Sequence, residues 1–145
     1  MTDDAAATLL DLEAIKTLKA RYFRCMDSKD WPGLADCFTE DLVADFSKGP
    51  GMYCEGRDNY MAQISEILKD ASTVHHGHMP EIELIDTDGA TGIWAMDDIV
   101  IMPGVELRGW GHYHETYRKE DGQWRIARIR LSRLRLLMNG EPQAL

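Results

Sequence analysis

The spacing of the apolar residues changes once along this chain, near residue 72, and this change constrains the fold more than any other feature. Before it, apolar residues recur every three or four positions, as they do in amphipathic helices. After it, they alternate with polar residues, as they do in strands that bury one face. Helices followed by a run of strands are typical of an α+β domain.

Three helices are predicted in the first half of the chain. The longest covers about residues 9–26, and a short second helix follows Asp30 as its N-cap, with Pro32 in its first turn. The third helix covers about residues 57–69. A brief strand at 41–46 lies between the second and third helices.

Four strands are predicted in the second half, separated by short turn sequences. They cover about residues 74–86, 90–102, 107–119 and 123–137. We expect a curved antiparallel (mixed) sheet, with the helices packed on one of its faces. Such a sheet, wrapped around a long N-terminal helix, forms a cone whose mouth can hold a ligand.

Length, charge and cysteine content limit the function classes. With 145 residues and no internal repeat or linker, the chain is expected to form one domain, 1–145. A net charge of −9 argues against nucleic acid, because phosphate contacts need clustered lysine and arginine. Three cysteines without a C-x-x-C pair, and no apolar run near the N-terminus, favour a soluble cytoplasmic protein that does not bind a membrane.

Three of the five histidines lie within four positions, in the sequence "VHHGHMPEIEL". Simple alternation would turn His76 and His78 toward the buried face. Gly77 and Pro80, however, favour a β-bulge, and one extra residue reverses the facing of everything before it. We therefore predict that His75 points into the pocket and that His76 and His78 are ordinary hydrogen-bonded strand residues.

Two carboxylates are candidates for proton transfer. Asp27 lies at the C-terminal end of the long helix, where the helix dipole and burial would both raise its pKa. The alternative is that Asp27 only begins the turn that follows. Asp98 shares a strand face with Trp94 and Met96, so it should be paired, protonated or functional.

The other face of the same strand is also apolar, and this predicts an oligomer. Ile93, Ile99 and Ile101 lie opposite Asp98, which suggests that a partner subunit covers the outside of the sheet. We expect a homo-oligomer that buries these isoleucines or Leu131.

A second His-x-His pair, His112 and His114, raises a metal alternative. Two such pairs on neighbouring strands could present four imidazoles to one divalent ion. The spacing is common in strands, and no acidic ligand follows at a diagnostic distance, so a metalloenzyme is the less favoured hypothesis.

Five arginines crowd the last predicted strand: Arg125, Arg128, Arg130, Arg133 and Arg135. The simpler interpretation is a solvated face or a set of ion pairs with acidic neighbours. The alternative is that one or two of them lie at the mouth of the pocket and bind a carboxylate or a phosphate.

The segments "LEAIKTLKARYFRCMDSKDW", "TVHHGHMPEIEL", "ATGIWAMDD" and "YRKEDGQWRIARIRL" resemble the SnoaL-like branch of the NTF2-like superfamily. Within it they are most similar to the bile-acid 7α-dehydratases and more distantly similar to scytalone dehydratase. The resemblance covers about residues 9–137 and implies the NTF2-like cone. It also implies a catalytic set of Tyr22, Asp27, His75 and Asp98, and a trimer, with a dimer as the alternative.

The resemblance and the chemistry of elimination together predict a cofactor-independent hydro-lyase of the dehydratase type, or a related isomerase or cyclase, for a cyclic or polycyclic carbonyl compound. Asp27 would orient His75, His75 would move the proton, and Tyr22 would donate a hydrogen bond to a substrate oxygen. No metal or organic cofactor is needed. The expected substrate-binding residues are Trp31, His78, Trp94, Met96, Trp110 and His112.

A non-catalytic role is the main alternative. The chain would then be an NTF2-like ligand-binding module, or a structural subunit like the β-subunit of ring-hydroxylating dioxygenases. The complete Tyr22, Asp27, His75 and Asp98 set favours an enzyme, because a structural subunit does not need it.

Overall fold

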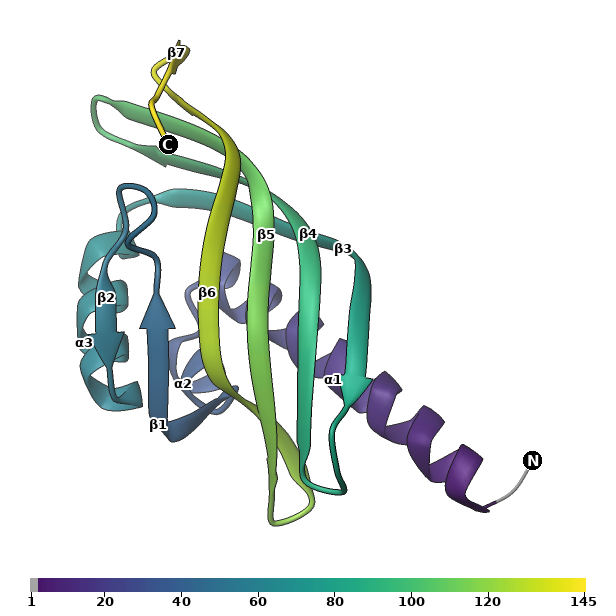
Figure 1. Cartoon of the computed structure of the whole chain (residues 1–145). Helices are drawn as coiled ribbons and strands as arrows, with labels where there is room; N and C mark the ends of the chain where they lie inside the picture. The colour runs from purple at the N-terminus through teal and green to yellow at the C-terminus, as the bar shows by residue number, and fades with distance from the viewer. Residues whose placement is uncertain (1–2) are drawn as a thin grey trace.

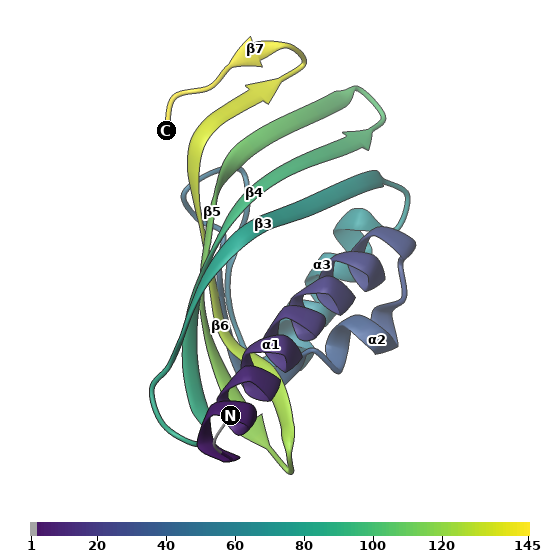
Figure 2. The ribbon, with the colours of Figure 1, turned by 90° about the vertical axis from the view of Figure 1, so that its right-hand side faces the viewer.

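The computed structural model describes residues 3–145 and consists of a curved sheet with three helices on its concave side (Figures 1 and 2). The helices are α1 (Asp3–Ser28), α2 (Trp31–Ala35) and α3 (Arg57–Leu68). The strands are β1 (Phe38–Asp45), β2 (Tyr53–Glu55), β3 (Ser72–Leu84), β4 (Gly89–Met102), β5 (Val105–Glu120), β6 (Gln123–Met138) and β7 (Glu141–Pro142). No helix among these residues has the length and apolar character that crossing a membrane would require.

The sheet is mixed, and its strand order is β2-β1-β6-β5-β4-β3, with β7 paired to β6. Strands β3 to β6 form the predicted antiparallel meander, whereas β1 pairs with β6 in parallel. The prediction of an α+β fold with a curved mixed sheet is confirmed.

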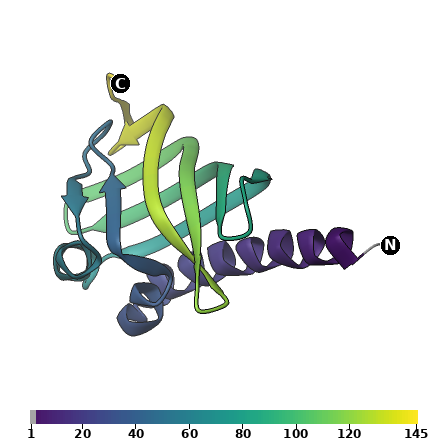
Figure 3. The ribbon, with the colours of Figure 1, turned by 60° about the horizontal axis from the view of Figure 1, so that its bottom comes forward.

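Helix α1 is longer than the apolar spacing predicted. It begins at Asp3 rather than near residue 9, and its first turns extend past the sheet (Figure 3). These turns contain Ala5 to Ala7, and alanine has the highest helix propensity, so they are helical although they bury little. The buried stripe begins further along the helix, at Ile15 and Leu18.

Strand β3 contains the predicted bulge. Its pairing with β4 shifts by one residue between His78 and Glu81, and Met79 there has a φ of 41°. As a result the residue facing the helices is His75, which is 9% exposed. The side chains of His76 and His78 lie on the outer face and are 60% and 55% exposed.

Gly77 lets α1 approach β3 closely. A Cβ atom at Gly77 would lie 2.7 Å from the ring of Phe23 and 3.3 Å from that of Trp94. Gly77 lies just before the bulge and does not have a positive φ, so the expectation that it forms the bulge is wrong; its role is to leave room for the Phe23 ring. Asp27 lies one turn beyond Phe23, so this contact sets how near Asp27 comes to β3.

We predict that Gly77→Ala destabilises the fold by about 1–3 kcal/mol, because the added methyl group overpacks the contact with Phe23. The measurement is the free energy of unfolding in urea. Gly49→Ala is the matched control, since the nearest atom to its Cβ would be 3.9 Å away. Equal losses in the two variants would show that the approach of α1 to β3 is not tight.

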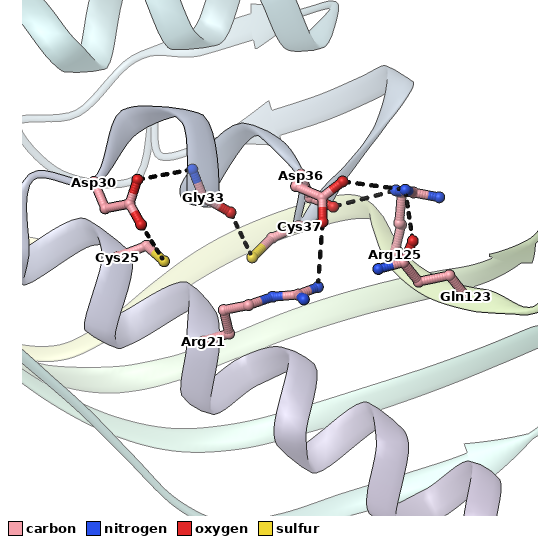
Figure 4. Close-up of polar contacts among 8 residues, drawn as sticks. All are labelled: Arg21, Cys25, Asp30, Gly33, Asp36, Cys37, Gln123 and Arg125. Carbon is pink, nitrogen blue, oxygen red and sulfur yellow. Dashed lines mark hydrogen bonds and ion pairs between the residues drawn. The ribbon is translucent and has the colours of Figure 1, made fainter.

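The corner between α1 and α2 is held by polar contacts (Figure 4). Asp30 is the predicted N-cap of α2, and its carboxylate accepts the Gly33 N–H at 3.0 Å. The Cys25 thiol donates to the same carboxylate at 3.7 Å, and Arg21 lies 3.8 Å from Asp36. These contacts anchor the end of α1, which carries Asp27.

Candidate active site

Asp27 and His75 are in direct contact across the interface of α1 and β3. Nδ1 of His75 lies 2.7 Å from Oδ1 of Asp27, and the backbone N–H of His75 donates to Oδ2 at 2.8 Å. Two bonds to the two carboxylate oxygens orient the imidazole ring. Nδ1 is thereby engaged, so Nε2 is the nitrogen left for a ligand.

The hydrogen bonds that Asp27 accepts lower its pKa by more than its burial raises it. Burial raises the pKa of this carboxyl group, but the ring and the backbone N–H of His75 lower it, as does Thr73, whose hydroxyl donates at 2.9 Å. The net pKa of Asp27 is below its ordinary value. The predicted rise in this pKa is therefore wrong, because a carboxylate that accepts several hydrogen bonds is stabilised in its charged form.

This lowered pKa predicts how stability depends on pH. Asp27 adds stability that is fully present above its unfolded pKa of about 3.8 and is lost as the pH falls through the folded pKa. Unfolding midpoints measured from about pH 5 to about pH 2 should therefore fall more steeply for the wild type than for Asp27→Asn. Parallel curves would mean that the hydrogen bonds to Asp27 do not stabilise its charge.

Asp98 forms a buried two-point ion pair with Arg133. Nη1 and Nη2 of Arg133 lie 2.6 and 2.9 Å from the two carboxylate oxygens, and the side chains are 7% and 5% exposed. Asp98 is also the register partner of His75, so both side chains lie on the inner face of the sheet. Of the three alternatives for Asp98 (paired, protonated or functional), the structure shows that it is paired.

The sequence left open that one or two of the five arginines lie at the pocket; Arg133 does line it, but the sequence did not single it out. The pairing of β5 with β6 shifts between Trp110 and Gly111, where β6 has one extra residue, Leu134. Arg133 lies two residues beyond Leu131, which lines the cavity, so alternation places both side chains on the inner face, whereas Leu134 is 70% exposed. The available signal was this alternation of Ile129, Leu131 and Arg133, which the apolar Leu134 obscures because no glycine or proline marks the extra residue.

Tyr22 lies on α1, is 1% exposed, and lines the cavity. Burial raises its pKa well above the ordinary value, and the nearby Tyr113 and Tyr60 add to the effect. The phenol therefore keeps its proton and can donate a hydrogen bond to a ligand.

A buried ion pair behind the Tyr22 ring was not anticipated. Nζ of Lys19 lies 2.8 Å from Glu115, both side chains are fully buried, and the Tyr117 hydroxyl donates to the same carboxylate at 2.7 Å. Burial lowers the pKa of Lys19 to about 8, although the Glu115 charge opposes this. The ammonium also lies 3.8 Å from the centre of the Tyr22 ring. The signal in the sequence was a lysine inside the apolar stripe of the first helix.

Tyr22, His75, Asp98 and Arg133 border a mainly apolar cavity of about 320 Å³. Lys48 also lines it, whereas Lys19, Glu115 and Asp27 do not. Its apolar lining residues include Met26, Phe46, Met52, Ile64, Val100, Met102, Leu107, Leu131 and Met138. A few polar groups in an apolar enclosure are typical of a small-molecule site.

The predicted substrate-binding residues do not line this cavity: Trp31, His78, Trp94, Met96, Trp110 and His112. Trp94 and Met96 are buried in the core, and Trp94 donates to Tyr117 at 2.9 Å. His78 lies on the outer face of the sheet, 2.6 Å from Asp97. The apolar wall comes instead from α3, from the segment between β1 and β2, and from the sheet where β4 ends, β5 begins and β6 ends.

The outer histidines do not form a recognisable metal centre. Within residues 3–145, no three histidine, cysteine, aspartate or glutamate side chains are grouped as a metal ion would require. The rings of His112 and His114 are 6.3 Å apart, and His76 and His78 both lie near Asp97.

Residues 7–130 match the model of the SnoaL-like domain, so the predicted resemblance is confirmed. The "Probable cyclase FGR4" of Gibberella zeae is 28% identical over 133 residues, covering 83% of this chain and 89% of that protein. A scytalone dehydratase-like protein of Novosphingobium aromaticivorans is 24% identical, with a TM-score of 0.81 over 92% of this chain and 90% of that one. The hexachlorocyclohexane dehydrochlorinase LinA-type3 of Novosphingobium barchaimii is 17% identical, with a TM-score of 0.79 over 97% and 94%. At these identities the two solved structures establish a shared fold.

Proposed function

The chain belongs to the SnoaL-like domain family, and we propose that it is a cofactor-independent lyase of the dehydratase type, or a related isomerase or cyclase. Its substrate would be a cyclic or polycyclic carbonyl compound. The single observation that carries the proposal is the 2.7 Å contact of Asp27 with His75, which lines an apolar cavity. Relatives named as a cyclase, a dehydratase and a dehydrochlorinase support an enzyme that converts small molecules.

In this mechanism, Nε2 of His75 removes a proton from a carbon next to the substrate carbonyl. The C–H electron pair forms the new C=C bond as the C–O bond to the leaving hydroxyl breaks. The proton then passes from His75 to the departing hydroxide, and one water is released. Asp27 holds the ring through Nδ1 and stabilises the imidazolium that forms between the two steps.

Tyr22 and the Asp98–Arg133 pair would fix the substrate. The protonated Tyr22 donates a hydrogen bond to the carbonyl or the leaving oxygen, which stabilises charge as it develops there. Asp98 is held at two points by Arg133, so we assign it a role as part of this pair rather than as a free carboxylate.

We predict that Asp27→Asn and His75→Ala each lower kcat by about 10²–10⁴. The two residues act as one unit, so the double variant should lose little more than the worse single variant. Tyr22→Phe should cost less, because it removes one hydrogen-bond donor. The measurement is the rate of water elimination from a cyclic hydroxyketone.

His76→Ala is the matched control for this prediction, because its side chain is 60% exposed on the opposite face of β3. It should leave kcat close to that of the wild type. If His76→Ala abolished turnover and His75→Ala did not, the catalytic assignment would be wrong.

We also propose that the protein is a homo-oligomer, a trimer by family analogy or a dimer, that buries the outer face of the sheet. Val74, Ile93, Ile101 and Trp110 lie on this face and are 37–44% exposed. Leu131 does not contribute, because it is 7% exposed and lines the cavity. Apolar side chains gathered on one sheet face are typical of a protein interface.

Ile93→Glu should therefore shift the mass measured by light scattering toward that of a monomer, because it places a charge in the proposed interface. Leu10→Glu is the control, since Leu10 lies on α1 and is 71% exposed. A wild-type protein that is monomeric at micromolar concentration would contradict the proposal.

A further inference from the structure

The residue that follows helix α1 is a lysine, Lys29, at a position where glycine is usual. Lys29 has a φ of 61°, in the left-handed region. Its N–H donates to the Met26 carbonyl at 3.3 Å, and the N–H of Asp30 donates to the Cys25 carbonyl at 2.9 Å. This is the Schellman pattern, whose left-handed residue is most often glycine because a side chain is strained there. Strain of this kind is found at functional sites.

The Lys29 side chain reaches the proposed site through one hydroxyl group. Its Nζ donates to Oγ1 of Thr73 at 3.0 Å, and Oγ1 of Thr73 lies 2.9 Å from Oδ1 of Asp27. The same Oδ1 lies 2.7 Å from Nδ1 of His75. Lysine, threonine, aspartate and histidine thus form one continuous chain of hydrogen bonds.

The chemistry of the groups fixes which one donates in each of these hydrogen bonds. An ammonium group has no acceptor, so Lys29 must donate to the Thr73 oxygen. Thr73 carries one hydroxyl hydrogen, and with its oxygen already accepting, that hydrogen is directed to Asp27. Thr73 is 6% exposed, so little water competes for the hydroxyl.

We propose that Lys29 and Thr73 are positioning residues that hold Oδ1 of Asp27 against Nδ1 of His75. Lys29 sets the direction of the Thr73 hydroxyl, and the hydroxyl prevents the carboxylate from rotating. The kinetic consequence of this inference rests on the proposed function, whereas its structural consequence does not.

If this positioning is lost, kcat should fall while KM stays nearly the same. Thr73 and Lys29 are not among the residues that line the cavity, so they do not touch a bound substrate. Loss of the Thr73 hydroxyl should lower kcat by about 10- to 100-fold and leave KM nearly unchanged, as is usual for groups that orient a catalytic side chain.

The first experiment uses the protein without ligand. The proton NMR spectrum should show a far-downfield Nδ1 proton from the short bond of His75 to Asp27, assigned by its absence in His75→Ala. Thr73→Ser, which keeps the hydroxyl, should retain this signal. Thr73→Val and Lys29→Met should shift it upfield or broaden it through exchange with water. An unchanged signal in Thr73→Val would overturn the inference.

The second experiment separates positioning from stability. Lys29→Gly relieves the left-handed strain, so its melting temperature should be no lower than that of the wild type, while that of Lys29→Met falls below it. Both variants should nevertheless lose the downfield signal and show a lower kcat. If Lys29→Gly kept the wild-type signal and kcat, Lys29 would be only a solvated helix end.

Thr91→Val is the matched control for Thr73→Val. Thr91 lies on β4 and pairs with Glu83 and Thr116, at the opposite end of the strand from the His75–Asp98 pair. Catalysis is measured as the exchange of solvent deuterium into α-tetralone, a bicyclic ketone. Thr91→Val should change neither the downfield NMR signal nor this exchange. The two claims can fail separately. If Thr73→Val loses the NMR signal but the wild type catalyses no exchange, the proposed function is refuted and the positioning role is retained.

Discussion

The hydrogen bond between Asp27 and His75 joins helix α1 to strand β3, and the rest of the candidate site depends on it. Two features of the chain make it possible. The bulge between His78 and Glu81 turns the His75 side chain toward the helix, and Gly77 lets the helix approach within contact of the strand. Either feature alone would leave the two side chains apart.

The interior around this bond combines apolar walls with charges that are matched in pairs. Lys19 neutralises Glu115 behind the Tyr22 ring, and Arg133 neutralises Asp98 at the cavity wall. Such pairing is required, because an unpaired charge in an apolar interior is costly. Apart from Lys48, which also lines the cavity, a substrate therefore meets hydrogen-bond donors and an oriented imidazole.

The three helices, the brief strand after α2, the four long strands and the facing of His75 could be predicted because their signals are local, whereas the short strands β2 and β7 were not predicted. The change in apolar spacing near residue 72 marks the helices and strands, and Pro80 lies within the bulge. The parallel pairing of β1 with β6 could not be predicted, because it joins segments that are far apart in the sequence.

The same reason explains the errors within the site. The pKa of Asp27 was predicted in the wrong direction because its donors, Thr73 and His75, are 46 and 48 residues away. Arg133 was not singled out because the neighbouring apolar Leu134 suggests the opposite facing, and no glycine or proline marks the extra residue there. The ion pair of Lys19 with Glu115 was not predicted because Glu115 lies 96 residues further along the chain.

The central claim is that this cavity takes a proton from a carbon next to a carbonyl group, with His75 as the base. Its most direct measurement is the incorporation of deuterium from solvent into a panel of cyclic and bicyclic ketones, because that exchange needs neither a leaving group nor a known natural substrate. The account predicts exchange by the wild type well above buffer, and exchange at the buffer rate for His75→Ala. Equal rates for the two proteins, or a wild type that never exceeds buffer, would contradict it.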